Sequence, residues 1–457
     1  MAILATLHPM RTRFRHIWEI LSSSYWFIPT LMVFGAAGMA IGFIYVDRTL
    51  LHSRESQGWL YGGGPEGGNT LLSTVAGSIV TVAGVVFSIT IAALSQASSQ
   101  FGPRLLRSFM RDTGNQVVLG TFVGTFVYCL LVLRTVHAKT AEGPEFVPHA
   151  SITVAVLLAV LSIGVLVYFI HHVSVSLQAP MVVAHARADF DEVVARMDEE
   201  MGAAGAEAVA DARDLRPADF EATARTVPSH VNGYIQAVDY DGLLASATEL
   251  GLTLQLKHRP GDYVIEQNVL LLAWPPERCD EAVQHRLRDA FMCGRHGTPE
   301  QDLEYGVRQI VEIAVRALSP GINDPFTAIN CIDALGSAIC TVARRGLPGP
   351  LRYDDDGVLR LVTPVTTFGG LVDMAFNQIR QYGRTSVPVT LRLLEVIAVA
   401  AEQLTGSEER AALLRHAEMI HRSGQSAFSE PGDLADLNQR WAAATAALGC
   451  GTEPGRS

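Results

Sequence analysis

The side chains best suited to bind a ligand surround one stretch of the chain, residues 317–335, which reads ALSPGINDPFTAINCIDAL. Asparagine and aspartate supply oxygen atoms that bind cations and other polar ligands in proteins. Both residue types occur at the centre of this stretch, and further polar residues precede the helix that leads into it. The candidate polar ligand site consists of Asn323, Asp324, Ser319, Arg295 and Asp302.

The same stretch also has a purely structural interpretation. Pro320 stops a helix, and Gly321 is typical of a helix end. Asp324 followed by Pro325 is typical of a helix start. These preferences explain most of the unusual composition without a ligand, although they do not explain Asn323. The sequence therefore favours a helical corner and leaves the ligand site open.

A second candidate site lies on the second of four long apolar runs. One face of this run carries Thr, Ser, Thr, Val, Ser, Ala, Ser and Ser at positions 74, 78, 81, 85, 88, 92, 95 and 99. Such a stripe can line a neutral pore, and arginines at its cytoplasmic end would attract anions. The alternative, which the sequence favours, is that small residues allow close helix packing and that the arginines only set the topology. The candidate pore-lining residues are Thr74, Ser78, Thr81, Ser88 and Ser95, and the candidate anion-attracting mouth is Arg104, Arg107 and Arg111.

The chain lacks the motifs of common catalytic and cofactor-binding sites. GGGPEG at residues 62–67 has the letters of a dinucleotide fingerprint but no preceding strand, and no P-loop, zinc-protease or EF-hand sequence occurs. The six cysteines form no C-x-x-C pair. His171 and His172 end the fourth apolar run, where a metal-binding or pH-sensing role is conceivable but uncommon. We expect no catalytic residue, no metal and no cofactor, and an enzyme is the least favoured class of function.

Four runs without Asp, Glu, Lys or Arg are each about 20 residues long, which is the length a helix needs to cross a bilayer. They are Tyr25–Val46, Leu71–Leu94, Asn115–Leu133 and Ser151–Ile170. Arginines precede the first run and separate the second from the third, whereas the other connections carry both charges. The positive-inside rule then places both termini in the cytoplasm. We expect a multi-pass protein of the bacterial inner (plasma) membrane.

The remainder of the chain is expected to form a cytoplasmic region. Helical periodicity continues from the fourth run into a stalk, and β-branched and aromatic clusters then predict short strands. The predicted layout is a cytoplasmic N-terminal segment (1–24), a four-helix transmembrane domain (25–176), a stalk helix and connector (177–225), a small β-containing module (226–277), a helical cytoplasmic domain (278–448) and a flexible tail (449–457). The fold class is an α-helical membrane protein with four transmembrane helices and a mainly α-helical α+β cytoplasmic domain. The acidic excess of that domain disfavours nucleic acid as a partner.

Local signals predict where several cytoplasmic helices begin. Asp241 is a candidate N-cap within the β-containing module, and TPEQ at residues 298–301 has the pattern of a capping box. The helix that follows TPEQ carries charges of alternating sign at intervals of four, which is typical of a solvated or partner-facing face and not of a site. This charge ladder is Glu304, Arg308, Glu312 and Arg316. Further helices are predicted near residues 367–382, 388–404, 408–422 and 433–448.

Several blocks of the sequence resemble a known family. GYIQAVDYDGLL, PGDYV, QDLEYGVRQIVEIAVRALSPGINDPFTA and AFNQIRQYGR, with four spans and SSQFGPRLL after the second span, are similar to the domain of unknown function 2254 family of predicted bacterial membrane proteins. The resemblance runs from roughly residue 20 to residue 405, and ALSPGINDPFTA is its most specific block. It implies the architecture given above and brings no established activity or catalytic residue.

Two classes of function remain after these exclusions. The leading interpretation is an oligomeric channel or transport-like protein whose cytoplasmic domain senses a ligand or partner. The alternative is a membrane-anchored sensor or scaffold without conduction. The expected partners are the lipid bilayer, further copies of the chain, and a small ligand or ion.

Overall fold

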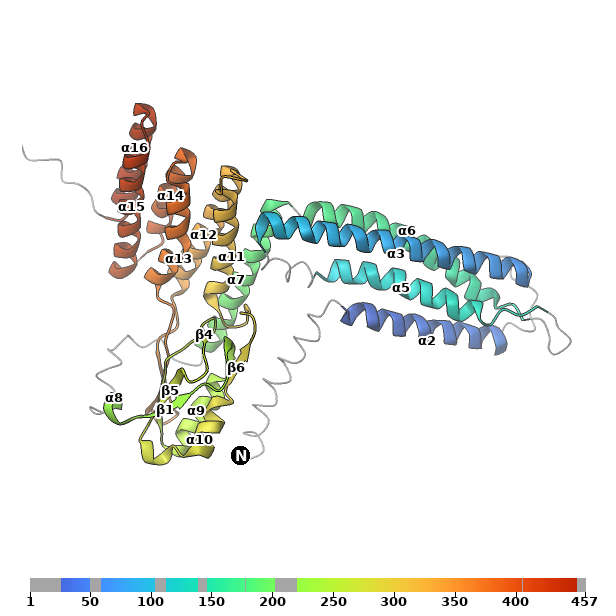
Figure 1. Cartoon of the computed structure of the whole chain (residues 1–457), viewed down its shortest axis with the longest axis horizontal. Helices are drawn as coiled ribbons and strands as arrows, with labels where there is room; N and C mark the ends of the chain where they lie inside the picture. The colour runs from blue at the N-terminus through green and yellow to red at the C-terminus, as the bar shows by residue number, and fades with distance from the viewer. Residues whose placement is uncertain are drawn as a thin grey trace, which may run out of the picture. The chain divides into compact units, whose positions relative to one another are not determined.

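A computed structural model describes residues 26–49, 59–102, 112–138, 146–176, 178–201, 220–404 and 406–449 of the chain (Figure 1). The chain divides into two compact units. One holds the described residues up to Met181, and the other holds those from Val182 onward.

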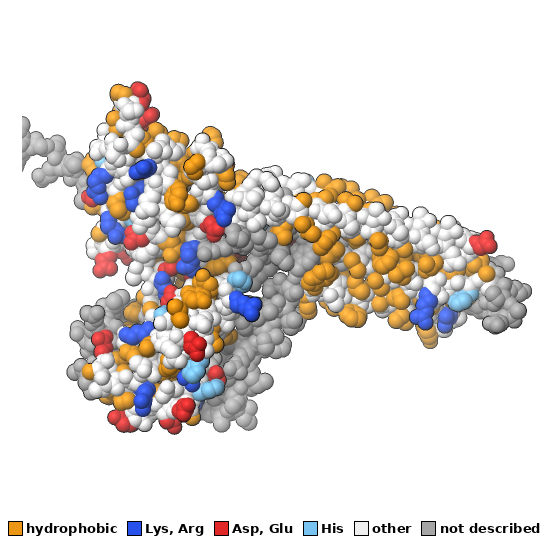
Figure 2. All heavy atoms as spheres, in the orientation of Figure 1, with side chains coloured by type: hydrophobic (Ala, Val, Ile, Leu, Met, Phe, Trp, Pro, Cys, Tyr) orange, Lys and Arg blue, Asp and Glu red, His pale blue; other side chains and the backbone are white. Residues whose placement is uncertain are grey.

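The first unit is a bundle of apolar helices. Its helices are α2 (Phe27–Thr49), α3 (Pro65–Phe101), α5 (Thr113–Leu133) and α6 (His149–Ser176). Helix α5 packs against the other three and is the most buried of them. Gly120 and Gly124 allow this packing, because a Cβ atom at Gly120 would lie 2.5 Å from the Met32 sulfur and one at Gly124 would touch Ala36, both on α2. The face of the bundle that Figure 2 shows is almost free of charged side chains over most of its length.

Asp47 ties the end of α2 to the start of α6. Its carboxylate accepts hydrogen bonds from the backbone N–H groups of Ala150 and Ser151 and from the Ser151 hydroxyl, at 2.7–3.0 Å. A carboxylate at this position satisfies N–H groups that a helix leaves unpaired at its own N-terminus. The predicted first span ends at Val46, but α2 continues through Asp47 to Thr49 because this interhelical cap offsets the burial of the carboxylate.

Five described helices are long and apolar enough to cross a membrane. They are α2, α3, α5, α6 and α12 (Pro325–Arg345). The first four overlap the predicted spans, whereas α12 was predicted only as part of the helical cytoplasmic domain. It belongs to the second unit and is the least apolar of the five. The chain is thus a mostly helical protein with several candidate membrane spans.

Helix α7 (Ala179–Met201) leads into the second unit. The sequence predicts a stalk helix that continues from the fourth span, but α6 ends at Ser176 and a separate helix begins at Ala179. Pro180 lies in the first turn of α7, and a proline cannot donate the hydrogen bond that would extend α6. Further along, Val182, Ala186, Phe190 and Val193 are buried, so α7 packs into the unit along most of its length.

Two mainly antiparallel sheets follow, and their strands come from distant parts of the chain. Their elements are α8 (Phe220–Thr223), β1 (Arg225–Pro228), β2 (Gly233–Val238), α9 (Tyr240–Leu250), β3 (Thr253–Leu256), β4 (Tyr263–Val264), β5 (Val269–Trp274), η1 (Pro276–Arg278), α10 (Glu281–Arg288), β6 (Phe291–Gly294), β7 (Leu351–Tyr353) and β8 (Leu359–Val362). The strand orders are β1-β5-β3-β8-β7 and β4-β2-β6. The predicted module of residues 226–277 therefore leaves out three strands, because β6 pairs with β2 and β8 pairs with β3 across long sequence separations.

The remaining helices form a stack of three hairpins. They are α11 (Leu303–Ala317) with α12, α13 (Phe368–Gly383) with α14 (Val387–Ala401), and α15 (Ser407–Ala427) with α16 (Pro431–Ala447). Helices α11, α13 and α15 pack side by side in one layer, and α12, α14 and α16 pack in the other (Figure 1). The hairpin β7–β8 interrupts the predicted helical domain of residues 278–448 between α12 and α13.

Two predicted helix starts are wrong. Helix α11 is capped by Asp302, not by Thr298, and α9 is capped by Asp239, not by Asp241. The TPEQ segment does not start a helix because the Gln301 side chain bonds the backbone N–H and carbonyl of Val238, at 2.8 and 3.2 Å. Gln301 thus attaches the segment before α11 to strand β2.

Candidate functional site

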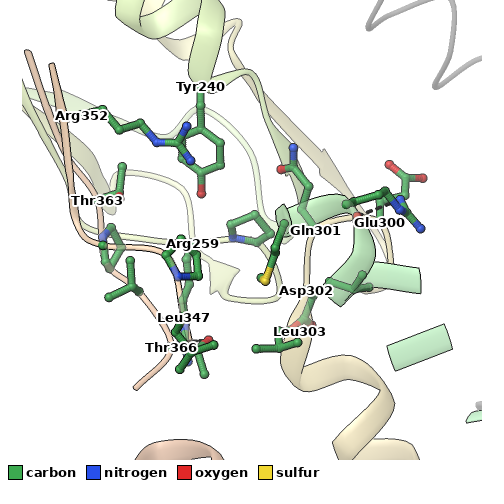
Figure 3. Close-up of a pocket in the computed structure, with 18 residues that line it drawn as sticks. Tyr240, Arg259, Glu300, Gln301, Asp302, Leu303, Leu347, Arg352, Thr363 and Thr366 are labelled. Carbon is green, nitrogen blue, oxygen red and sulfur yellow. Dashed lines mark hydrogen bonds between the residues drawn. The ribbon is translucent and has the colours of Figure 1, made fainter. Parts of the chain in front are cut away.

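The second unit contains a cavity where α7, the sheets and the first helical hairpin meet (Figure 3). Its volume is about 80 Å³, which is room for several water molecules or a small polar group. It is lined by Val193, Arg196 and Met197 of α7, by Tyr240, Arg259, Pro260 and Arg352, and by residues 300–303, 347–349 and 363–366. Because these segments are far apart in the sequence, only the tertiary fold assembles the cavity.

A network of two carboxylates and two arginines supports one wall of the cavity, and two of its members, Arg259 and Asp302, line the cavity themselves. Arg259 donates to Glu304 at 2.5 Å and to the Thr366 hydroxyl, also at 2.5 Å. Arg308 pairs with both Asp302 and Glu304. Asp302 and Glu304 are 4% and 7% exposed, so the charges are compensated by partners instead of by water. The wall is a preformed, electrically balanced surface.

Gly261 allows the loop after β3 to approach this wall. Its φ is +94°, a conformation that side-chain-bearing residues rarely adopt, and a Cβ atom there would lie 2.3 Å from an Asp302 carboxylate oxygen. The close approach places Arg259 and Pro260 against the cavity. The PGDYV block and the QDLEYG block, which are separate in the sequence, therefore meet at Asp302.

Two further arginines reach the cavity from other elements. The guanidinium of Arg352, on β7, lies over the Tyr240 ring at 4.6 Å, and Figure 3 shows the Tyr240 hydroxyl directed toward the cavity. Arg196, on α7, donates to the backbone carbonyl of Glu300 at 2.9 Å. The Arg196 Nε atom is buried and has no hydrogen-bond partner within the part of the chain that the structure describes. An additional acceptor in the cavity would satisfy it.

The charge of the lining favours an anion. Three arginines line the cavity with two carboxyl groups, those of Glu300 and Asp302. Burial raises the pKa of Asp302 to about 6, and its pairing with Arg308 offsets only part of that rise. Arginine side chains bind carboxylates and phosphates through paired N–H donors. A cation would instead have to compete with Arg308 for the Asp302 carboxylate.

The structure does not bring the predicted polar site together. Ser319, Asn323 and Asp324 lie at the C-terminal end of α11, whereas Asp302 caps its N-terminal end and Arg295 precedes it. Helix α11 has 15 residues, so its two ends are roughly 22 Å apart. Only Asp302 of the five lines the cavity.

The corner residues make the contacts of a helix boundary. The Asp324 carboxylate accepts hydrogen bonds from the N–H groups of Phe326 and Thr327 and from the Thr327 hydroxyl, at 2.6–3.1 Å. The Ser319 hydroxyl donates to the Arg316 carbonyl at 2.6 Å. Asn323 adopts a φ of +50°, which asparagine tolerates better than most residues. These contacts favour the structural interpretation of ALSPGINDPFTA.

The candidate pore-lining residues all lie on an exposed face of α3. Thr74, Ser78, Thr81, Ser88 and Ser95 are exposed within the single chain. The hydroxyls of Thr74, Thr81 and Ser88 donate to carbonyls four residues earlier in their own helix, at 2.7–2.9 Å. They are therefore satisfied without a pore or a neighbouring helix. The candidate mouth, Arg104, Arg107 and Arg111, lies outside the described residues.

The structure gives the paired histidines no shared ligand. His172 lies 2.5 Å from the carboxylate of Asp112, which also caps α5. The contact joins the start of α5 to the end of α6. Within the described residues, no group of three or more His, Cys, Asp or Glu side chains is placed to hold a metal ion.

The charge ladder on α11 is partly buried. Glu304 and Arg308 were predicted to lie on a solvated or partner-facing face, but Glu304 is buried and both residues belong to the ion-pair network beside the cavity. Arg259, the partner of Glu304, lies 45 residues before it, so the spacing along one helix could not reveal this pair. The available signal was that Arg259 directly precedes the PGDYV block, and that Glu304 and Arg308 both lie in the block that begins QDLEYGVRQ.

Comparison with known proteins places the chain in a family. The family described as "Predicted membrane protein (DUF2254)" matches residues 22–399. Uncharacterized proteins of Mycobacterium bovis and of two strains of Mycobacterium tuberculosis are each 31% identical over 439 residues, which is 95% of this chain and 82% of theirs. No solved structure matches the chain. The chain belongs to the DUF2254 family of predicted membrane proteins.

Proposed function

We propose that the chain is a membrane-anchored sensor that binds a small anion in the cavity of its second unit. The observation that carries this proposal is that α7 has two roles. Its C-terminal half contributes Val193, Arg196 and Met197 to the cavity, and its first residue follows α6 after only two intervening residues. A ligand that contacts α7 can therefore act on the segment that enters the membrane.

The proposed topology has four spans, α2, α3, α5 and α6, with both termini in the cytoplasm. Helix α12 has the length of a fifth span, but polar contacts along it support a place outside the membrane. Asp333 pairs with Arg392 at 2.5 Å, and Arg187 donates to the Ala334 carbonyl and the Thr341 hydroxyl. Charged groups facing lipid at such positions would be costly.

The proposed ligand class is a small carboxylate, phosphate or sulfate compound. Arginines from three separate elements converge on one cavity, and the planar guanidinium group suits such anions. The cavity wall is held by ion pairs, so the arginines need little reorganisation on binding. The full chain in detergent, probed with sulfate and with citrate at matched ionic strength, provides the test.

We expect citrate or sulfate to raise the thermal midpoint of the parent protein. At a hundredfold excess over Kd the gain is about 2.7 kcal/mol, or several degrees. Sulfate also stabilises proteins non-specifically, so the Arg196→Gln and Arg352→Gln variants are decisive. These two variants should lose the part of the rise in thermal midpoint that comes from specific anion binding. The Arg286→Gln control breaks an exposed pair with Glu249 outside the cavity and should keep that part of the rise. Equal shifts in all four proteins would refute the anion site.

A second candidate function is conduction by an oligomer. The exposed small-residue face of α3 supports it, because another copy of the chain could cover that face and enclose a path. The test is ion flux in liposomes with the Thr81→Leu and Ser88→Leu variants. A pore lined by this face predicts reduced flux at unchanged oligomer size. Flux that is unaltered, or absent from the parent protein, would leave the sensor as the function.

A further inference from the structure

The corner between α11 and α12 exposes large apolar side chains. Phe326 is 78% exposed and Ile322 is 43% exposed. The backbone between them is held in place, because the Asp324 N–H donates to the Ala317 carbonyl at 2.8 Å and the Asp324 side chain caps α12. Both apolar side chains are therefore held outward on a fixed turn.

The end of α13 adds to this exposed surface. The Leu318 side chain would lie 3.4 Å from a Cβ atom at Gly383, so the end of α11 and the end of α13 are neighbours. Tyr382 is 57% exposed, and Arg384 is also exposed. Aromatic and basic side chains beside aliphatic ones are typical of surfaces that contact the membrane–water interface.

The start of α7 lies at the same end of the helical stack. Gly306, in the first turn of α11, packs against Ala186, whereas Arg196, ten residues further along α7, bonds the carbonyl of Glu300 before α11 begins. The two helices are therefore antiparallel. At about 1.5 Å per residue, α7 extends roughly 10 Å back from Ala186 to its first residue, whereas α11 extends roughly 16 Å from Gly306 to its last, so α7 begins about one turn short of the level at which α11 ends.

The chain itself links this end of the stack to a candidate membrane span. Helix α6 ends at Ser176 and α7 begins at Ala179. An extended chain spans at most about 3.6 Å per residue, so the link is no longer than roughly 11 Å. Helix α6 is one of the helices able to cross a membrane, so under the proposed topology the start of α7 is tethered within that distance of a span.

We propose that this corner contacts the bilayer surface, with Ile322, Phe326 and Tyr382 entering the interface and Arg384 facing the lipid phosphates. The inference rests on the proposed assignment of α6 as a transmembrane helix. It gives the ALSPGINDPFTA block a role beyond capping, because the block presents Ile322 and Phe326 to lipid.

The test measures the accessibility of spin labels on the full chain in nanodiscs that hold one chain each. Labels are attached at Phe326→Cys, at Ser407→Cys and at Val160→Cys, with the parent protein labelled in parallel to subtract the native cysteines. Ser407 is exposed at the first residue of α15, shortly after the end of α14, and Val160 is 62% exposed in the middle of α6. Collisions with oxygen report lipid, and collisions with a water-soluble nickel complex report water.

We expect the label at position 326 to collide severalfold more often with oxygen and severalfold less often with nickel than the label at position 407. The Ile322→Glu change should remove much of this protection.

Equal nickel accessibility at positions 326 and 407, with position 160 protected, would overturn the inference and leave the topology intact. Exposure of position 160 to nickel would overturn the topology as well. Protection at 326 only in discs with two chains would identify a second copy as the occupant and overturn the lipid contact.

Discussion

At the scale of single residues, Asp302 joins the fold to the candidate site. Its carboxylate caps α11 by accepting from the Glu304 N–H at 3.0 Å, pairs with Arg308 and lines the cavity. Burial places its pKa at about 6, well above the ordinary value for aspartate. One side chain therefore couples the start of a helix, an ion-pair network and the charge of the cavity.

Asp302 should make anion binding depend on pH. Because its pKa in the folded protein is raised to about 6, protonation below that pH removes a negative charge from the cavity. We expect sulfate, which does not titrate in this range, to bind roughly three- to tenfold more tightly at pH 5.5 than at pH 7.5. Titration calorimetry on the full chain at both pH values measures the change.

The Asp302→Asn variant is the control, since asparagine retains the capping ability. It should bind sulfate with similar affinity at both pH values. The contribution of Asp302 to the stability of the parent protein changes in the same direction with pH. Because its pKa is raised on folding, this contribution is present below the ordinary pKa of 3.8 and is lost as the pH rises through about 6. A parent protein whose sulfate affinity is flat across this range would contradict the assignment.

Asp324 should behave as a helix cap and not as a ligand residue. The Asp324→Ala change removes the acceptor for two N–H groups and a hydroxyl, which should cost about 1 kcal/mol and lower the thermal midpoint by roughly 2–4 °C. Asp324→Asn should lie close to the parent. Both variants should keep the citrate-dependent shift, and loss of that shift in a folded Asp324→Ala protein would restore the corner as a binding site.

The stability that the Asp324 cap contributes should depend on pH in the opposite direction from that of Asp302. A hydrogen bond from the Thr327 hydroxyl, partly opposed by desolvation, holds the pKa of Asp324 below its ordinary value. The contribution of this cap is therefore present above the ordinary pKa and is lost as the pH falls through the lowered one. The Asp324→Ala penalty should consequently shrink in strong acid, whereas the Asp302 effect is confined to the range between about pH 4 and pH 6.

At the scale of elements, α7 connects the cavity to α6, one of the candidate membrane spans. It packs against α11 through Gly306, where a Cβ atom would lie 2.9 Å from the Phe190 Cβ and 3.0 Å from the Ala186 carbonyl oxygen. It also reaches α12 through Arg187. A sensor that works through α7 requires this close contact to be maintained.

Replacing Gly306 by valine should loosen the contact between α7 and α11. Overpacking of this kind costs about 1–3 kcal/mol, so the thermal midpoint should fall by several degrees. Hydrogen exchange should become faster in the buried segment around Phe190. Gly321→Ala is the matched control, because a Cβ atom there would meet no other atom within 4 Å. An unchanged midpoint in Gly306→Val would show that α7 does not depend on this packing.

At the scale of the whole molecule, the placement of α12 decides the topology. Length and apolar composition make it a candidate span, but it packs on α11 and α14, and Gly336 leaves no space against Val396 of α14. Its apolar side chains thus have protein partners. A fifth span would also place the residues before and after α12 on opposite sides of the membrane.

The topology can be tested by labelling in inverted membrane vesicles. Asn330 is exposed on α12, so an impermeant maleimide should modify Asn330→Cys about as readily as Ser407→Cys. Val160→Cys in α6 should remain unmodified until detergent is added. Protection of position 330 in intact vesicles, together with labelling of position 407, would indicate that α12 enters the membrane.

Much of the architecture follows from the sequence because it depends on local signals. Runs of about 20 apolar residues identify α2, α3, α5 and α6 whatever their neighbours. Asp324 with Pro325 marks the start of α12, and the amphipathic patterns near residues 367–448 mark the last four helices. The family resemblance also depends on contiguous blocks, and the match over residues 22–399 confirms it.

Only the tertiary structure assembled the candidate site, because its residues come from segments that share no local pattern. Arg196, Arg259 and Arg352 lie on different segments of the chain. The spacing of Glu304 and Arg308 along α11 is typical of a solvated face, and only the fold shows that Arg259 pairs with Glu304. Tertiary contacts of Gln301 with Val238 likewise explain why α11 begins after Asp302 and not after Thr298. The same physics governs each case: spacing along one helix determines which side chains share a face, but only the fold determines what that face meets.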